Sequence, residues 1–178
     1  PLTIGIDRDI TEKVKAMTER EEALGALAAS RRRLSTLLSN LPGMAYRCAN
    51  EPGSPMEFVS DGCRKLTGYT PTELTGRDGV PYTDLIHPGD RQRVWETIQT
   101  AVDAGEPFVI EYRLHTREGE ERWVWERGRT ANGEDESRAF LEGFITDITE
   151  RKKAASQREA ALAALSENET RFHLLMKH

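Results

Sequence analysis

The cysteines and histidines are the residues whose chemistry could most readily identify a cofactor or a reaction. Cys48 and Cys63 form no CxxC pair, so their spacing indicates neither a zinc site nor a disulfide framework. His87 stands before a Pro-Gly-Asp turn, and His115 ends an expected strand. We find no histidine–cysteine–carboxylate spacing that indicates a metal ligand set. We therefore expect no metal site.

Motifs for binding nucleotides or activating a nucleophile are also missing from the sequence. It has no glycine-rich phosphate loop, no GGDEF-like sequence and no nucleophile beside a base. Catalytic residues are accordingly expected to be none, and we expect this chain not to be an enzyme by itself.

The composition limits the partners that the chain can have. Its 178 residues are 31% charged and carry a formal net charge of -5, which argues against nucleic acid as a partner. No apolar run approaches the roughly 20 residues that span a bilayer, and no signal peptide is visible. We expect a cytoplasmic fragment without direct membrane contact, although the parent protein could be membrane-anchored.

The two ends of the chain resemble each other. Residues 5–12 match residues 143–150, and the same offset continues without a gap, aligning His173 with Ser35. His173 is therefore interpreted as a structural residue and not as a phosphoacceptor. The match predicts four segments: the tail of a preceding repeat (1–10), a helical linker (11–40), one complete domain (41–150) and a second helical linker entering a following repeat (151–178).

Both linkers show heptad spacing, which is typical of coiled coils. The positions are Met17, Arg20, Leu24, Leu27, Arg31, Leu34, Leu38 and Leu41 in the first, and Ala155, Arg158, Leu162, Leu165, Glu169, Phe172 and Met176 in the second. Charged residues at core positions predict weak coils, which suit a switch. We expect a homodimer through these helices; the alternative is that each helix lies against its own domain. Asp147 with Glu150 is expected to cap the second helix.

Between the linkers, the pattern predicts an α+β domain. Two short strands at 44–48 and 56–60 precede several short helices and a longer helix at 90–104. Three antiparallel strands follow, of which 108–114 shows the clearest alternation of apolar and polar residues. The last strand, 139–148, runs directly into the second linker helix.

Several short motifs in this order resemble the PAS domain family, in the branch found in bacterial sensor kinases and cyclic-di-GMP enzymes. They are Phe58-Val59-Ser60, Leu66-Thr67-Gly68-Tyr69, Glu73-Leu74-Thr75-Gly76-Arg77, Ile86-His87-Pro88-Gly89-Asp90-Arg91, Glu111-Tyr112-Arg113-Leu114, Gly119-Glu120-Glu121-Arg122-Trp123-Val124 and the stretch from Gly143 to Arg151. The resemblance implies a five-stranded antiparallel sheet with helices over one face, a pocket between them, and signalling helices at the termini. Gly89 departs from the family, which usually has an acidic residue there.

The resemblance also bears on cofactors. Light-sensing flavin relatives need a cysteine just after the Gly-Arg that here is Gly76-Arg77, where Asp78 follows instead. Haem-sensing relatives place a histidine on or beside the long helix, and 90–104 contains none. Flavin and haem are thus not expected, and the cofactor, if any, is unknown.

The expected site has two parts, a pocket and a relay. Aromatic and aliphatic residues that could line the pocket, or simply fill the core, are Tyr46, Phe58, Leu66, Tyr69, Leu74, Leu85, Ile86, Val94, Ile98, Ile110, Tyr112, Trp125 and Phe144. The expected relay from the last strand to the helix consists of Asp147, Ile148, Thr149 and Glu150.

Two functions follow from this organisation. The first is a sensory PAS module of a multidomain bacterial signalling protein, relaying a ligand or conformational signal through its helical linkers to an output domain in the same chain. The alternative is a ligand-free dimerisation and spacer module. In either case the expected neighbours are further PAS repeats and an output domain, namely a histidine kinase or a diguanylate cyclase.

Overall fold

The computed structural model describes residues 4–39, 41–75, 79–132 and 139–176. The motif residues Gly76, Arg77 and Asp78 lie outside these ranges. The chain divides into two units, residues 1–40 and residues 41–178, and each is described by itself.

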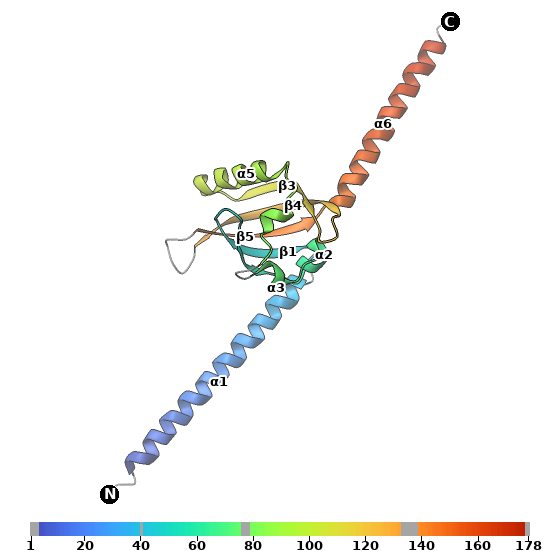
Figure 1. Ribbon diagram of the computed structural model, residues 1–178. Coiled ribbons are helices and arrows are strands. Elements are labelled where there is room, and N and C mark those ends of the chain that lie inside the picture. The colour runs from blue at the N-terminus through green and yellow to red at the C-terminus, as the bar shows by residue number, and fades with distance from the viewer. Residues whose placement is uncertain (1–3, 40, 76–78, 133–138, 177–178) are drawn as a thin grey trace. The chain divides into compact units, whose positions relative to one another are not determined.

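A five-stranded antiparallel sheet forms the centre of the second unit (Figure 1). Its strands are β1 (Met44–Ala49), β2 (Met56–Val59), β3 (Phe108–His115), β4 (Glu121–Asn132) and β5 (Ala139–Asp147). Their spatial order is β2-β1-β5-β4-β3, so the last strand of the chain lies in the middle of the sheet. This arrangement confirms the predicted fold class.

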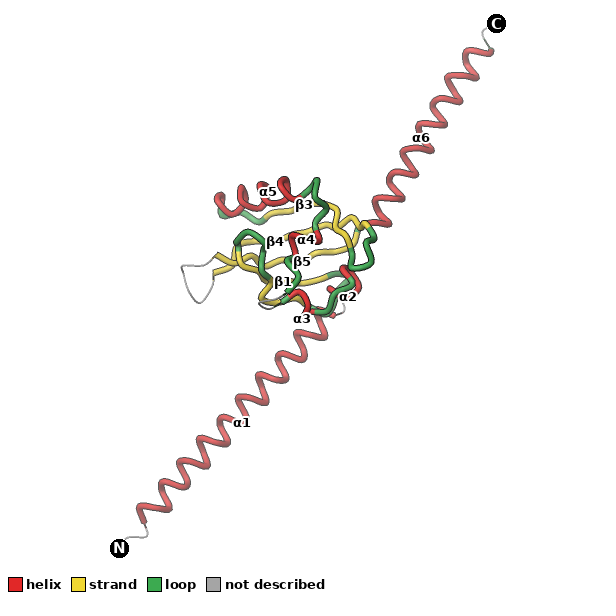
Figure 2. Tube along the Cα trace, in the orientation of Figure 1, coloured by secondary structure: helices red, strands yellow, loops and turns green. Residues whose placement is uncertain are grey.

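Four helices lie between β2 and β3 in sequence and cover one face of the sheet (Figure 2). They are α2 (Cys63–Thr67), α3 (Pro71–Leu74), α4 (Tyr82–Leu85) and α5 (Arg91–Ala104). A capping box begins α3, because the Thr70 side chain accepts the Glu73 N–H while the Glu73 carboxylate accepts the Thr70 N–H. Helix α5 carries its apolar stripe, including Val94 and Ile98, toward the core.

The core lies between the sheet and these helices. Alternation in β3 buries Ile110, Tyr112 and Leu114, and the residues of β4 that face the same way are Val124 and Glu126. Cys63 of α2 is fully buried, as expected of a small core residue.

The register of β2 departs from simple alternation. Arg47 pairs with Phe58 but Cys48 pairs with Met56, so Glu57 is an extra, bulged residue of β2. Met56 and Val59 therefore both face the core, while Phe58 lies on the outer face and is 47% exposed. Phe58 was expected in the pocket because regular alternation would place it on the same face as Met56. The extra residue of the bulge moves it to the outer face.

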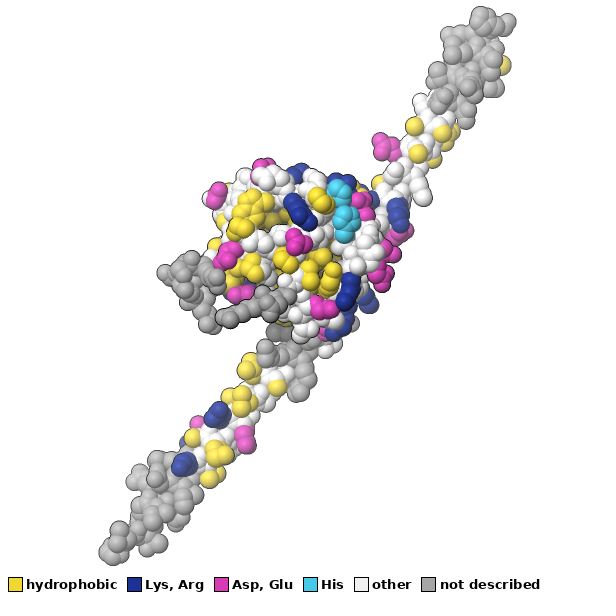
Figure 3. Space-filling model, in the orientation of Figure 1, with side chains coloured by type: hydrophobic (Ala, Val, Ile, Leu, Met, Phe, Trp, Pro, Cys, Tyr) yellow, Lys and Arg dark blue, Asp and Glu magenta, His cyan; other side chains and the backbone are white. Residues whose placement is uncertain are grey.

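The terminal helices are α1 (Ile4–Ser39) and α6 (Thr149–Leu175). Residues 5–10 match the end of β5 in sequence, but they belong to α1. A strand needs neighbouring strands to satisfy its backbone hydrogen bonds, whereas a helix satisfies them within the segment. Apolar side chains are exposed along the described parts of both helices (Figure 3).

Candidate functional site

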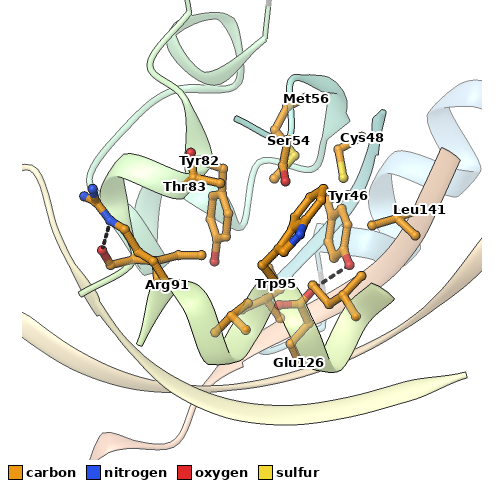
Figure 4. A pocket seen from close by; sticks show the side chains of 14 residues that line it. Tyr46, Cys48, Ser54, Met56, Tyr82, Thr83, Arg91, Trp95, Glu126 and Leu141 are labelled. Carbon is orange, nitrogen blue, oxygen red and sulfur yellow. Dashed lines mark hydrogen bonds between the residues drawn. The ribbon is translucent and has the colours of Figure 1, made fainter. Parts of the chain in front are cut away.

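A small pocket opens between the sheet and helices α4 and α5 (Figure 4). Its volume is about 50 Å³. The lining residues come from four strands, two helices, the β1–β2 loop and the α4–α5 loop: Tyr46, Cys48, Ser54, Met56, Tyr82, Thr83, Ile86, Arg91, Val94, Trp95, Ile98, Glu126, Leu141 and Ile145. Most of this wall is apolar, which is typical of ligand pockets with a few fixed polar groups.

A buried glutamate with tyrosine partners forms the polar part of this wall. The Tyr46 hydroxyl donates to Oε1 of Glu126, and the Tyr112 hydroxyl donates to Oε2 at 2.6 Å. The hydroxyls of Tyr112 and Tyr82 lie 2.9 Å apart and are also hydrogen-bonded. Because the single hydroxyl hydrogen of Tyr112 is used in the bond to Glu126, the Tyr82 hydroxyl is the donor in its bond to Tyr112. The four side chains thus form one hydrogen-bonded chain from α4 through β3 and β4 to β1.

Burial dominates the electrostatics of this cluster. Glu126 is 4% exposed, and loss of solvation raises the pKa of its carboxyl although both tyrosine hydrogen bonds lower it. Burial, with the Glu126 charge nearby, also raises the pKa of the Cys48 thiol to about 12. The same two causes raise the pKa values of Tyr46, Tyr82 and Tyr112. These four neighbours therefore stay neutral at neutral pH, and Cys48 is not a reactive nucleophile.

Two glycines make room for the Tyr46 ring. Gly128 of β4 and Gly143 of β5 are paired across the sheet, and a Cβ atom at either position would lie 2.8 Å from the Tyr46 hydroxyl oxygen. The absence of side chains there lets Tyr46 lie flat against the sheet and reach Glu126.

The predicted pocket residues divide into three groups. Tyr46, Ile86, Val94 and Ile98 line the pocket. Six others belong to the core or pack against it without lining the pocket, namely Leu66, Tyr69, Leu74, Leu85, Ile110 and Tyr112. Tyr112 nevertheless takes part through its bond to Glu126.

The remaining predicted residues lie elsewhere. Trp125 and Phe144 are half-buried on the opposite face of the sheet, because the inward positions of β4 and β5 are taken by Glu126 and Ile145. Phe58 is on that outer face too, as described above. Trp125 was predicted as the pocket residue of β4, and Glu126 was missed. The pairing of Tyr112 with Val124 across the hairpin was the available signal, since cross-strand partners share a face.

The pocket does not fit a flavin or a haem. A volume of about 50 Å³ holds only a few non-hydrogen atoms, and the rings of Tyr46, Tyr82 and Tyr112 occupy the surrounding space. Two of these tyrosines are tied to Glu126, so a large planar cofactor would have to break the buried cluster.

The predicted relay residues lie where β5 passes into α6. The backbone N–H of Ile148 donates to the Trp123 carbonyl at 2.8 Å, and the Trp123 N–H donates to Oγ1 of Thr149 at 3.0 Å. An Asp147 carboxylate oxygen accepts the Thr149 N–H at 2.8 Å. Glu150 was expected to complete a capping box with Asp147 but accepts from Lys153 instead. The main chain of Asp147 belongs to β5, where it pairs with Val124, while its carboxylate accepts the N–H of the first residue of α6.

Side chains of the first helical turn reach the outer face of the sheet. Glu111 of β3 forms ion pairs with Arg151 and, at 2.6 Å, with Lys152. The Lys152 ammonium also lies 4.7 Å from the centroid of the Trp123 ring. These contacts hold the start of α6 against β3 and β4.

A second buried acidic group positions α5. Asp90 is 6% exposed and accepts three hydrogen bonds from Arg113: from the backbone N–H at 2.9 Å, from Nε at 3.0 Å and from Nη2 at 2.9 Å. The Arg113 guanidinium lowers the pKa of Asp90 to about 2. Asp90 therefore anchors the start of α5 to β3 instead of capping the helix with its side chain.

One group of side chains could hold a metal ion. His87, His115 and Glu121 each offer an atom within 4.8 Å of the others, because His115 and Glu121 are cross-strand partners. However, Nδ1 of His87 accepts the Gly89 N–H at 3.1 Å, which puts the proton of the neutral ring on Nε2, 3.9 Å from Glu121. A metal on Nε2 would have to displace that proton and the Gly89 bond, so the geometry favours a histidine–carboxylate contact.

In the described part of the chain, no helix has both the length and the apolar composition needed to cross a bilayer.

Two known proteins are similar to this chain in sequence. A methyl sulfide methyltransferase-associated sensor of Methanosarcina acetivorans is 34% identical over 136 residues, covering 75% of this chain and 13% of that protein. A blue-light-activated histidine kinase of Brucella ovis is 40% identical over 96 residues, covering 54% of this chain and 18% of the kinase. The chain thus spans less than a fifth of the length of either relative.

A solved structure gives the same result for the fold. A sensory box histidine kinase/response regulator from Burkholderia thailandensis superimposes with a TM-score of 0.58 at 26% identity, covering 76% of this chain and 98% of that one. The sequence profile of the PAS fold matches residues 56–145, from the second strand to the middle of the last. With five antiparallel strands in the order β2-β1-β5-β4-β3, the chain belongs to the PAS domain family as a sensory, regulatory module.

Proposed function

We propose that this chain relays the state of its pocket to an output domain elsewhere in the same protein, by way of β4, β5 and α6. One observation carries the proposal. Strand β4 contains Glu126, which lines the pocket, and three residues earlier it contains Trp123, whose backbone groups bind Ile148 and Thr149 at the start of α6. A shift of β4 would therefore change both the pocket and the hydrogen bonds at the start of α6. A ligand needs only a few kcal/mol of differential binding to shift such an equilibrium.

The whole protein is proposed to be a bacterial histidine kinase located in the cytoplasm or anchored with this domain on the cytoplasmic side. The 40% identity to the Brucella kinase supports this output, and a diguanylate cyclase is the alternative. Residues 1–10 and 151–178 are proposed to connect to neighbouring PAS repeats. At one constant offset, residues 1–10 align with the last strand of this domain (139–148), and residues 151–178 align with the linker that precedes it (13–40).

Dimerisation through the helical linkers is proposed as the means of output. In α1, Met17, Leu24 and Leu27 are more than half exposed, and Leu162 and Leu165 of α6 are equally open. These residues occupy the heptad positions identified in the sequence, and pairing with a second copy would bury them. Sedimentation equilibrium of the 178-residue chain should show a monomer–dimer equilibrium, which Leu162→Glu with Leu165→Glu should shift to monomer.

The relay is tested by Asp147→Ala in the full-length protein. Loss of the carboxylate that binds the Thr149 N–H should leave the domain folded but abolish the response of the output activity to the input signal. Asp103→Ala, at an exposed position of α5, is the matched control. A full response in the Asp147→Ala protein would exclude this junction as the relay.

A ligand-free spacer is the second candidate, and the small pocket supports it. Native mass spectrometry of protein purified from cells separates the two candidates. A retained small molecule supports sensing, and a stable dimer without one supports the spacer.

A further inference from the structure

Three aromatic rings and one carboxylate surround the same small space. Tyr46 from β1, Tyr82 from α4 and Trp95 from α5 all line the pocket, and Glu126 of β4 lies at its base (Figure 4). They come from separate elements and converge only in the folded domain. Aromatic walls with a carboxylate are the usual means of binding an organic cation in proteins, since the ring faces carry negative potential.

The Glu126 charge has no cationic partner among the residues that the structure describes. Its only side-chain hydrogen bonds there are from Tyr46 and Tyr112, and no described arginine, lysine or histidine lies within ion-pair distance. Arg91, which also lines the pocket, donates from Nε to the Ile86 carbonyl at 3.0 Å and from Nη2 to the Asp84 carbonyl at 2.9 Å. A buried carboxylate without a counter-charge is costly, so a cation that enters the pocket gains a strong partner.

We propose that the pocket binds a small alkylammonium cation, with its charge at Glu126 and its alkyl groups against Tyr46, Tyr82 and Trp95. This ligand class rests on the proposed sensing function and specifies what is sensed. The apolar lining, which includes Met56, Val94 and Leu141, suits the alkyl groups.

Size and charge narrow the ligand further. About 50 Å³ admits only a few non-hydrogen atoms, so methylammonium to trimethylammonium is the expected range. When Glu126 is ionised, it repels an anion, and a neutral molecule leaves the carboxylate charge unpaired.

The test is isothermal titration calorimetry of the 178-residue chain with methylammonium, dimethylammonium and trimethylammonium chloride. Methanol, ethanol and 2-propanol are the neutral probes with the same numbers of non-hydrogen atoms, and sodium acetate is the anionic probe. We expect at least one of the ammonium ions to bind roughly tenfold or more tightly than its neutral counterpart. Glu126→Gln keeps the shape of the side chain and should weaken that binding at least about tenfold. Glu118→Gln makes the same charge change on an exposed turn and should bind as the wild type does.

Trp95→Leu provides a second variant in case Glu126→Gln alters the fold. It removes an aromatic wall on α5 while keeping an apolar one, and it should weaken ammonium binding without weakening 2-propanol binding. Binding of methylammonium should also tighten as pH rises through the titration of Glu126, because only the ionised carboxylate pairs with it. The other titratable groups that face Glu126, namely Tyr46, Tyr82, Tyr112 and Cys48, have raised pKa values and remain neutral over that range.

The ligand class and the relay are tested by separate experiments. If none of the three ammonium ions binds, or if they bind equally well to the Glu126→Gln and Trp95→Leu chains, the ligand class is wrong. The response of the Asp147→Ala protein tests the relay independently of these titrations.

Discussion

The side-chain oxygen of Thr149 accepts the backbone N–H of Trp123 at 3.0 Å, linking the first residue of α6 to strand β4. The Trp123 carbonyl accepts the next backbone N–H along this junction, that of Ile148. Both backbone groups of one residue are thus used by the segment that leads into the helix. The start of α6 is therefore positioned by β4, which also contributes Glu126 to the pocket.

Replacing Thr149 by valine tests this contact. Valine keeps the branched shape but leaves the Trp123 N–H without its acceptor, which should cost about 1 kcal/mol. Hydrogen exchange followed by NMR should show roughly fivefold faster exchange of the Trp123 amide if exchange proceeds by local opening. Thr97→Val, which removes an exposed hydroxyl bond to Arg93 in α5, should leave the Trp123 amide unchanged. Unaltered protection of Trp123 in the Thr149→Val chain would show that the contact is not formed in solution.

Glu126 should make stability depend on pH. Its pKa is raised in the folded state, so between its ordinary and its raised value the folded protein holds a proton that the unfolded chain has released. Stability is therefore highest below the ordinary pKa of about 4.3 and falls as pH rises through the folded-state pKa. In urea denaturation, Glu126→Gln should gain stability relative to wild type as pH rises from about 4 to 8. A difference that stays constant over this range would contradict the assignment.

Asp90 should make the folded protein less stable as the pH falls, which is the opposite of the effect of Glu126. Its pKa of about 2 in the folded state is below the ordinary value, so its contribution is present above about pH 4 and is lost as pH falls toward 2. The shift corresponds to about 2 kcal/mol of stability at neutral pH. Asp90→Asn should lose roughly this amount in urea denaturation at pH 7, and the deficit should shrink as the pH is lowered. An equal deficit at every pH would mean that packing, and not the Arg113 ion pair, is what asparagine disrupts.

Gly143→Ala tests the space beside Tyr46. The new methyl group would lie 2.6 Å from the Arg127 carbonyl oxygen and 2.8 Å from the Tyr46 hydroxyl, so strand or ring must move. We expect a loss of about 1 to 3 kcal/mol, with a shift in the NMR signals of the Tyr46 ring. Gly53→Ala would meet nothing within 4 Å, but its positive φ makes it a poor control. Gly25→Ala, also in open space and within α1, serves better and should not destabilise the chain.

The fold could be predicted largely because its strongest patterns are local. Alternation in β3, with Ile110, Tyr112 and Leu114 inward, follows from one buried face, and the Thr70–Glu73 capping box follows from the residue types at fixed spacing. Strand β2 was predicted in place, but the face of Phe58 depends on a bulge in its pairing with β1, which no pattern within β2 reveals.

The site was harder to predict because it is built around Glu126, and glutamate is seldom buried in a core. The sequence Arg122-Trp123-Val124-Trp125-Glu126 offers two faces, and aromatic residues ordinarily take the inner one. Here Glu126 faces inward and is hydrogen-bonded to Tyr46 and Tyr112, with Tyr82 bonded in turn to Tyr112, an arrangement that exists only after folding. The junction between β5 and α6 was predictable because the last strand runs directly into the helix, and Asp147 accepts the Thr149 N–H there; the predicted partner of Glu150 was wrong, since Glu150 accepts from Lys153.

Hydrogen exchange at the junction of β5 and α6 tests most directly whether the pocket is coupled to α6. It measures the stability of the hydrogen bonds at the start of α6 when only a pocket residue is changed. The amides to follow are Trp123, Ile148, Thr149 and Lys152, each of which donates a defined hydrogen bond. If the pocket is coupled to the helix through β4, their protection should differ between the wild-type and Glu126→Gln chains and be the same in wild type and Glu118→Gln. Altered protection around the pocket with unchanged protection of all four junction amides would contradict the relay.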